Sequence, residues 1–354
     1  MTNENQNKKI KCVVWDLDNT IWDGILLEDK EVKLRENVIN VIKILDERGI
    51  LNSIASKNEH EIALAKLKEF GILDYFLAPQ INWNPKYLSI KQISEELNIG
   101  IDTFAFVDDQ MFELDSVKHY LPEVPVINAE NVFQIPKMPM MQAVFITQDS
   151  KLRRKMYMND IKRKEIEDSF AGSQQDFLAS LEMKFSIEQA TEADLQRAEE
   201  LTLRTNQLNS TGYTYSYDEL KEKLNSDEYC LLVASLEDKY GTYGKIGLAL
   251  IKKESDTWVL HLLLMSCRVM SRGVGNLMLS YIINQAKQQN TKLLAYFVPT
   301  DRNRMMYMTY KFAGFQEKEK IDDRVVLEHD MLDVHEIPSY VTLYATSLGK
   351  DDEV

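Results

Sequence analysis

Two aspartates follow an apolar segment of strand length near the start of the chain. The segment 11–15 runs directly into Asp16 and, two positions later, Asp18. Side chains two apart on an extended segment leave the same face, and open α/β sheets place their ligands at the carboxyl ends of their strands. Two adjacent carboxylates must share a proton or hold a cation. The pair therefore predicts phosphoryl transfer, with one carboxylate as nucleophile and Mg²⁺ neutralising charge.

Other polar side chains follow the next expected strands. Ser56 ends the second strand, Lys86 opens a helix after a proline, and Asp108-Asp109 ends the fourth strand. Because parallel strands end at one edge of a sheet, we expect these groups to converge there. A helix N-cap is an equally reasonable interpretation of Asp108-Asp109 taken alone.

Each of these groups has a role in such chemistry. Asp16 could attack phosphorus, and Asp18 could protonate the leaving oxygen and then activate water. Ser56 could donate a hydrogen bond to a phosphoryl oxygen, and Lys86 could neutralise charge. The expected metal ligands are Asp16, the main-chain carbonyl of Asp18, Asp108 and Asp109.

A second group of reactive residues lies near position 270. An apolar strand, 257–265, leads to Cys267, Arg268, Gly273 and Gly275, and an amphipathic helix follows. Glycines before a helix leave main-chain N–H groups available for a phosphate or pyrophosphate. The neighbouring arginine and helix N-terminus favour a nucleophilic thiolate at Cys267, although a structural cysteine fits equally well.

Alternating strand-like and helix-like segments must position the first group. This alternation over residues 11–130 predicts a doubly wound parallel sheet. Expected strands are 11–15, 50–55, 75–81, 103–107 and 124–127, and expected helices are 35–48, 59–70, 87–97 and 109–120.

A charged helical segment separates this half from an α+β pattern. The segment carries seven Lys and Arg residues between 151 and 164. The second half has expected strands at 184–189, 230–236, 244–253, 257–265 and 292–297, and expected helices at 193–205, 217–225, 274–289 and 302–313.

Length and composition fit a protein of two domains. With 354 residues, we expect a disordered lead-in (1–10), a first domain (11–145), a basic helical linker (146–183), a second domain (184–345) and an acidic tail (346–354). A formal charge of −14 argues against nucleic acid as a partner. Apolar runs too short for a spanning helix argue against a membrane partner. Cys12 and Cys230 look like buried hydrophobes, and the absence of a disulfide pattern indicates a reducing cytoplasm.

The motifs around Asp16, Ser56, Lys86 and Asp108 resemble the haloacid dehalogenase superfamily. The gaps between them are too short for a folded cap domain, so we expect an open site. The glycine turn, with Asn303 and the aromatic residues from 307 to 315, resembles the GNAT acetyltransferase fold. Met270 stands where that fold commonly has Arg or Gln, which argues against ordinary acetyl-CoA use.

Both halves together resemble the FkbH family, over residues 11 to about 330. The match includes the segments 56–58, 81–86, 106–109, 205–209 and 265–273. Gln110-Met111 departs from the Asn-Pro that the family commonly has there. The resemblance implies an enzyme that takes 1,3-bisphosphoglycerate, removes phosphate and loads the glyceryl unit onto an acyl carrier protein for polyketide assembly, with Cys267 carrying the acyl group. Alternatives are a stand-alone Mg²⁺-dependent phosphatase, a CoA-dependent acyltransferase and a scaffold.

An acidic carrier needs a basic docking patch on this acidic chain. The segment 151–164 is one hypothesis for that patch, and a solvated linker helix is the other. Arg268, Gly273 and Gly275 are expected to bind substrate or carrier. Asn206 and Asn209 are expected to do so as well, with helix capping as the alternative.

Overall fold

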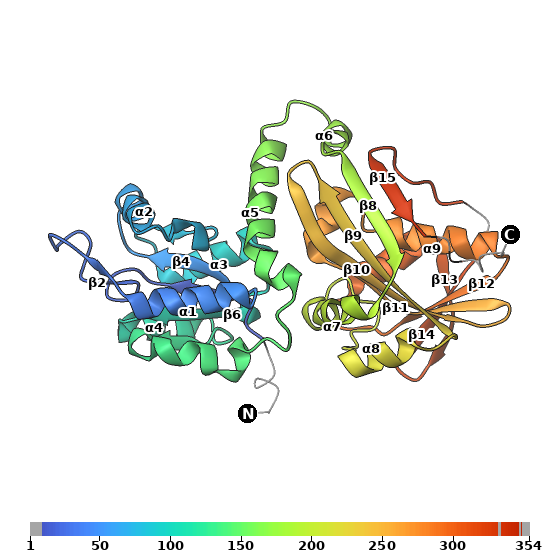
Figure 1. Cartoon of the computed structure of the whole chain (residues 1–354), viewed down its shortest axis with the longest axis horizontal. Coiled ribbons are helices and arrows are strands. Elements are labelled where there is room, and N and C mark those ends of the chain that lie inside the picture. Colours follow the sequence, from blue (N-terminus) through green and yellow to red (C-terminus); the bar gives the residue numbers. More distant parts are fainter. Residues whose placement is uncertain (1–8, 332–333, 347, 349–354) are drawn as a thin grey trace. The chain divides into compact units, whose positions relative to one another are not determined.

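The chain divides into two compact units within helix α5 (Gln148–Asp168) (Figure 1). We call Met1–Ile161 the first unit and Lys162–Val354 the second unit. This computed structural model describes residues 9–331, 334–346 and 348. The predicted lead-in up to residue 8, and most of the predicted tail, lie outside the described residues, whereas Ile10 is buried. Over the described ranges, no helix has both the length and the apolarity needed to cross a membrane.

The first unit is built on a five-stranded parallel sheet with the order β5-β4-β1-β6-β7. This confirms the predicted doubly wound architecture. The strands are β1 (Cys12–Trp15), β4 (Leu51–Ser56), β5 (Gln80–Ile81), β6 (Phe104–Asp108) and β7 (Val126–Asn128).

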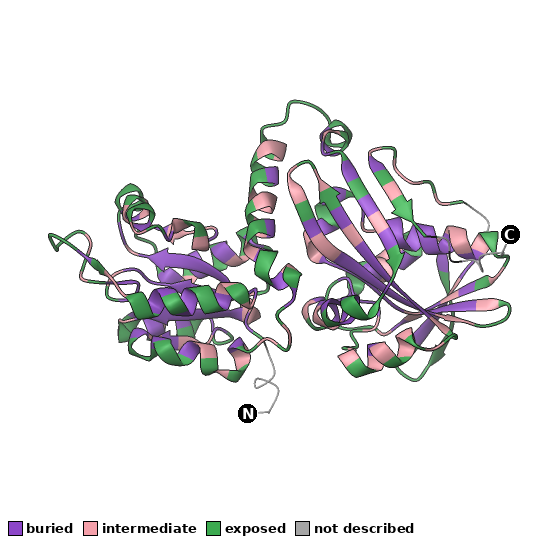
Figure 2. Ribbon diagram, viewed as in Figure 1, coloured by how far each residue is buried: buried purple, intermediate pink, exposed green. Residues whose placement is uncertain are grey.

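Helices cover both faces of this sheet, so its central strands are buried (Figure 2). Val13 and Trp15 pack in one apolar cluster with residues of α1 and α2, whereas Cys12 and Val14 pack in another with residues of α3 and α4. Alternate side chains of one strand thus serve two cores, as a period of two requires. The helices are α1 (Glu36–Glu47), α2 (His60–Glu69), α3 (Lys86–Glu96) and α4 (Met111–Tyr120).

Only a small insertion follows the first strand in the described chain. Between β1 and α1 lies the hairpin of β2 (Trp22–Asp23) and β3 (Lys33–Leu34), so the expectation of a domain without a large cap is confirmed. The strand predicted at 75–81 is shorter than expected, because Ala78 has a φ of 47° and Pro79 has no N–H to donate. Short 3-10 helices complete the unit: η2 (Leu73–Tyr75), η3 (Ile101–Thr103), η4 (Ala129–Lys137) and η5 (Pro139–Met141).

The second unit is built on an eight-stranded mixed sheet with the order β13-β14-β12-β11-β10-β9-β8-β15. Among the described strands of this second sheet, only the pairs β11–β12 and β8–β15 are parallel. The α+β prediction for this half is confirmed. The strands are β8 (Met183–Gln189), β9 (Tyr229–Asp238), β10 (Gly241–Lys253), β11 (Thr257–Met265), β12 (Lys292–Phe297), β13 (Phe315–Ile321), β14 (Arg324–His329) and β15 (Val341–Ala345).

Two apolar clusters lie on the two faces of the second sheet. Cys230 and Leu232 of β9 belong to the cluster that includes α6, α9 and α10, whereas Leu231 and Val233 belong to the one that includes α7 and α8. The helices are α6 (Gln174–Ser180), α7 (Leu195–Arg204), α8 (Tyr217–Leu224), α9 (Leu277–Gln288) and α10 (Arg304–Phe312), with the 3-10 helices η6 (Glu192–Asp194) and η7 (Cys267–Arg272).

Candidate functional site

Three adjacent strands of the first unit bring polar side chains to one edge of its sheet. Strands β4, β1 and β6 are neighbours, and Trp15 of β1 is in register with Val107 of β6. The residues that follow, Asp16 and Asp108, therefore leave the sheet side by side. Ser56 ends β4 and is buried. The structure thus brings the predicted strand-end residues to one place.

Lys86 joins the two carboxylates. It is the first residue of α3, and its Nζ lies 2.8 Å from Asp16 Oδ1 and 2.5 Å from Asp108 Oδ2. All three side chains are at most 5% exposed. Burial is the largest single effect on the pKa of Lys86, and it lowers that pKa. The charges and hydrogen bonds of Asp16 and Asp108 together outweigh burial, so the pKa is raised and the buried lysine keeps its charge.

Asp109 adds a third carboxylate to this cluster. Ligand oxygens of Asp16, Asp108 and Asp109 lie within 4.8 Å of one another. Burial, followed by the charge of Asp16, raises the pKa of Asp108 to about 7 and also raises the pKa of Asp109. Asp109 Oδ1 is buried without a hydrogen-bond partner. An all-oxygen set with excess negative charge and an unpartnered oxygen fits a hard divalent cation such as Mg²⁺.

Asp18 occupies a separate environment. Its Oδ1 accepts hydrogen bonds from Trp22 Nε1 at 2.8 Å and from Leu26 N at 3.0 Å, and its Oδ2 accepts from Asn58 Nδ2 at 3.0 Å. Burial raises the pKa of Asp18, and the hydrogen bonds from Leu26 and Trp22 partly oppose that shift. A carboxyl group with a raised pKa, fixed by three donors, is suited to give and take a proton.

Trp22 and Asn58 were not singled out in the sequence. Trp22 belongs to the hairpin that follows β1, and Asn58 lies two residues beyond Ser56. One signal was their position in the strand-end loops, and for Asn58 another was its place in the matched segment 56–58. Neither signal indicated contact with Asp18.

Helix capping does not account for Asp108-Asp109. The N-cap of α4 is Gln110, whose side chain makes no capping bond. Asp108 Oδ1 accepts a hydrogen bond from Gln110 N at 2.9 Å, while its Oδ2 faces Lys86. Asp108 therefore both orders the loop, through Gln110, and contacts the ammonium group of Lys86.

In the second unit, Cys267 is the first residue of η7, and its side chain is half-buried. Gly273 follows the last residue of η7 and has a φ of 66°, a left-handed conformation that favours glycine. A Cβ there would also meet the Tyr340 hydroxyl. The space beside Gly275 is open, and α9 begins two residues later.

The other residues expected to bind substrate have structural contacts. Arg268 Nη2 donates to the Tyr243 carbonyl at 2.9 Å. Asn209 is buried; its Oδ1 accepts from two main-chain N–H groups and its Nδ2 donates to two carbonyls, all between residues 205 and 213. Its hydrogen-bonding capacity is thus used within its own loop. Asn206 is exposed.

This same loop fills the space between two diverging parallel strands. β11 pairs with β12 only as far as Leu260. Beyond that point, Ser210 N donates to Leu263 O, and Val298 N donates to Ser210 O, each at 2.9 Å. Main-chain groups of β11 are therefore paired with the loop and are closed to a ligand at these positions.

Basic residues of the predicted linker contribute to the fold. Arg153 is buried and donates to Gly49 O, and Arg154 pairs with Asp46 at 2.9 Å. Arg163 is fully buried. The exposed basic residues of the segment are Lys151, Lys155, Lys162 and Lys164.

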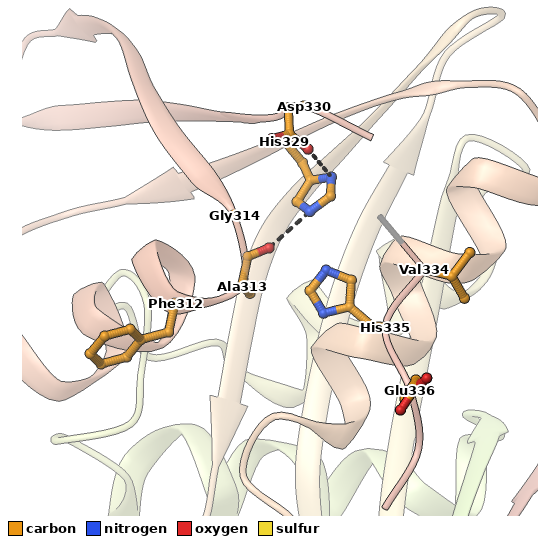
Figure 3. A pocket seen from close by; sticks show the side chains of 8 residues that line it. All are labelled: Phe312, Ala313, Gly314, His329, Asp330, Val334, His335 and Glu336. Carbon is orange, nitrogen blue, oxygen red and sulfur yellow. Dashed lines mark hydrogen bonds and ion pairs between the residues drawn. The ribbon is translucent and has the colours of Figure 1, made fainter. Parts of the chain in front are cut away.

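A cavity of about 300 Å³ in the second unit contains none of the predicted residues. His329 and His335 line it, with ring centroids 5.5 Å apart (Figure 3). His329 Nε2 lies 2.8 Å from the Ala313 carbonyl, and its Nδ1 accepts a hydrogen bond from Met331 N. Both ring nitrogens of His329 are thus engaged, so the ring serves the fold.

No protein-family model matches the sequence, and no curated protein matches it. Among solved structures, the N-terminal part of a Bacteroides fragilis protein, containing a phosphatase domain complexed with Mg, is 31% identical with a TM-score of 0.32. That match covers 38% of this chain and 38% of that chain. The PaiA N-acetyltransferase of Thermoplasma acidophilum, in complex with coenzyme A, is 14% identical with a TM-score of 0.33, over 41% of this chain and 98% of that one.

The ribosomal-protein alanine N-acetyltransferase of Escherichia coli is 14% identical with a TM-score of 0.32, over 41% of this chain and 90% of that one. The fold assignment follows from sheet order and strand direction. The first unit has the parallel-sheet architecture expected of a haloacid dehalogenase-like domain without a large cap, and the second unit has the mixed-sheet architecture expected of a GNAT-like domain.

Proposed function

We propose that the chain is an FkbH-like enzyme that takes 1,3-bisphosphoglycerate, removes its phosphates and loads the glyceryl unit onto the phosphopantetheine thiol of an acyl carrier protein. The observation that carries the proposal in the first unit is the buried contact of Lys86 with Asp16 and Asp108. In the second unit it is the half-buried Cys267, which opens the turn that follows the apolar strand β11. The first supports phosphoryl transfer, and the second supports acyl transfer.

The first unit removes the phosphate at C3. An oxygen of Asp16 attacks phosphorus, the bond from phosphorus to the C3 oxygen breaks, and Asp18 gives that oxygen its proton. Asp18 then takes a proton from water, which releases inorganic phosphate from Asp16. Lys86 and Ser56 hold the phosphoryl oxygens. Asp16, Asp108 and Asp109 would hold Mg²⁺, which would supply the positive charge that a phosphoryl dianion requires.

The second unit carries the acyl group. The Cys267 thiol loses its proton and attacks C1, a carbon–sulfur bond forms, and the bond between C1 and the acyl-phosphate oxygen breaks with loss of inorganic phosphate. The carrier thiol then attacks this thioester and returns the thiol of Cys267. Arg268 follows Cys267 within η7, and Gly275, with open space beside it, lies after the turn.

One experiment tests the proposal. The chain is incubated with 1,3-bisphosphoglycerate, Mg²⁺ and a phosphopantetheinylated carrier, and the carrier is weighed by mass spectrometry. We expect a glyceryl adduct with the unmodified chain, a phosphoglyceryl adduct with Asp16→Asn and no adduct with Cys267→Ala. Full loading by Cys267→Ala would overturn the covalent step.

A stand-alone phosphatase is the second candidate function. It is favoured by the location of Asp16, Asp18, Lys86 and Asp108 within one compact unit. Under this alternative, phosphate would be released while the mass of the carrier stayed unchanged.

A further inference from the structure

The turn that carries Cys267 is attached at both ends. Ser266 N, just before the turn, donates to Ile246 O at 2.6 Å. At the other end, Tyr340 donates to Gly273 O at 3.3 Å. Between these points, η7 buries Val269 and carries two arginines, Arg268 and Arg272.

Arg272 is the last residue of η7, and its side chain is 5% exposed. Its Nη1 lies 2.8 Å from Oε2 of Glu167, near the end of α5. The guanidinium also lies over the ring of Phe177 at 5.8 Å, and its Nε is buried without a partner. A buried guanidinium needs a counter-charge, and Glu167 provides it.

The last turns of α5 are themselves fixed to the second sheet. Arg163, one helical turn before Glu167, forms two 2.7 Å hydrogen bonds with Asp238, and both side chains are fully buried. Arg163 also stacks on Tyr243 at 3.9 Å, and the Tyr243 carbonyl accepts from Arg268. Both arginines of η7 are therefore tied to the end of α5, one directly and the other through Tyr243.

We propose that Glu167 is a positioning residue for acyl transfer, which it supports by holding Arg272 and hence the turn that begins at Cys267. Without the carboxylate, Arg272 would be a buried and unpaired cation. It would turn toward water and draw η7 with it, which would move the Cys267 thiol. The inference rests on the proposed function only in the assignment of acyl transfer to Cys267.

The test compares Glu167→Gln with Glu165→Gln in the full chain. Glu165 lies on the same helix and is exposed, so it serves as the matched control. Iodoacetamide is added to the folded protein, and alkylation of each cysteine is followed by mass spectrometry. We expect the rate at Cys267 to change about threefold or more in Glu167→Gln alone, since geometry controls access to a thiol. Cys12 and Cys230, both buried, should stay unreactive.

Carrier loading supplies the second readout. In Glu167→Gln we expect kcat for loading to fall roughly tenfold with the KM for the carrier unchanged, because misplaced reacting groups lose rate rather than binding. Release of the C3 phosphate, which the proposed function assigns to the first unit, should stay at the level of the unmodified chain. Glu167→Asp, which keeps the charge, should recover part of the loss.

Two results would overturn the inference. One is an alkylation rate at Cys267 that is the same in Glu167→Gln and Glu165→Gln. The other is faster alkylation of all three cysteines together, which would assign Glu167 to general stability. Alkylation needs no carrier and no substrate, so it decides the positioning role even where the unmodified chain loads nothing and the proposed function fails.

Discussion

At the scale of single residues, the cluster of Asp16, Lys86, Asp108 and Asp109 in the first unit has more negative than positive groups. Three carboxylates face one ammonium group, and burial keeps water from screening the excess negative charge. Burial, followed by the charge of Asp16, raises the pKa of both Asp108 and Asp109. A bound cation would remove the excess negative charge, so binding should appear as stability as well as activity.

We therefore expect Mg²⁺ to raise the melting temperature of the chain. Millimolar Mg²⁺ at about 100 times its Kd would add about 2.7 kcal/mol to the free energy of unfolding. In Asp109→Asn the gain should shrink by at least about half, because one charged ligand is lost. Calorimetry with and without Mg²⁺ measures both. Asp115→Asn, an exposed change on α4, is the control, and an equal gain in Asp109→Asn would exclude Asp109 as a ligand.

At the scale of elements, apolar patterning predicted the strands of the first sheet and the central strands of the second. β11 and β12 have the predicted bounds. β13, β14 and β15, toward the edges of the second sheet, were missed. In β13 every residue after Phe315 is exposed, so main-chain bonds to β14 hold it without an apolar alternation to indicate a strand. The hairpin β2–β3 was missed because each strand has two residues.

Some site residues could likewise be predicted from the sequence, and others could not. Asp16, Lys86 and Asp108 were predictable because they stand where parallel strands and a helix must meet. Trp22, Asn58 and Glu167 were not, since their partners are distant in sequence and come together only through tertiary packing.

His261 on β11 should make the stability of the folded chain depend on pH. Its ring lies between Tyr229 and Tyr296. Burial, followed by the charges of Arg324, Lys252 and Lys223, lowers its pKa to about 4, and Glu254 opposes this. The folded state therefore disfavours the proton that the unfolded state accepts below about 6.5.

The contribution of His261 to the free energy of unfolding should be fully present above pH 6.5 and should be lost as the pH falls toward 4. After allowance for partial exposure, we expect about 1 to 2 kcal/mol. Urea denaturation at pH 7.5 and pH 4.5 measures it. In His261→Gln the difference between the two pH values should be smaller by this amount, whereas His60→Gln, on the surface of α2, should leave it unchanged. The prediction fails if both variants behave alike.

Helix α5 contains two kinds of basic residue: some contact the fold and others are exposed to solvent. Arg153 and Arg154 contact the first unit, so their replacement would disturb folding and docking together. Lys151 and Lys155 lie four apart on one exposed helix face. If the carrier docks on this segment, Lys151→Glu/Lys155→Glu should raise its KM roughly threefold to tenfold, most strongly at low salt. Loading kinetics test this, with the exposed Lys118→Glu as control. An unchanged KM would remove the segment from the docking surface.

At the scale of the whole molecule, the question is where the first unit ends. The predicted domain stops at residue 145, whereas the compact unit extends to Ile161. The intervening residues pack into that unit: Met156 is 2% exposed, Arg153 is buried against Gly49, and Arg154 contacts both Asp46 and the Tyr75 ring.

Two truncated chains decide between these boundaries. A chain of residues 1–161 keeps these contacts, and we expect it to unfold cooperatively and to release the C3 phosphate at close to the rate of the full chain. A chain of residues 1–145 exposes the surface that Met156 covers and leaves Asp46 unpaired. Loss of one buried methionine alone costs about 2 to 5 kcal/mol, a large part of a typical stability of 5 to 15 kcal/mol. The shorter chain should therefore melt well below the longer one, and equal melting temperatures would show that α5 adds nothing to the first unit.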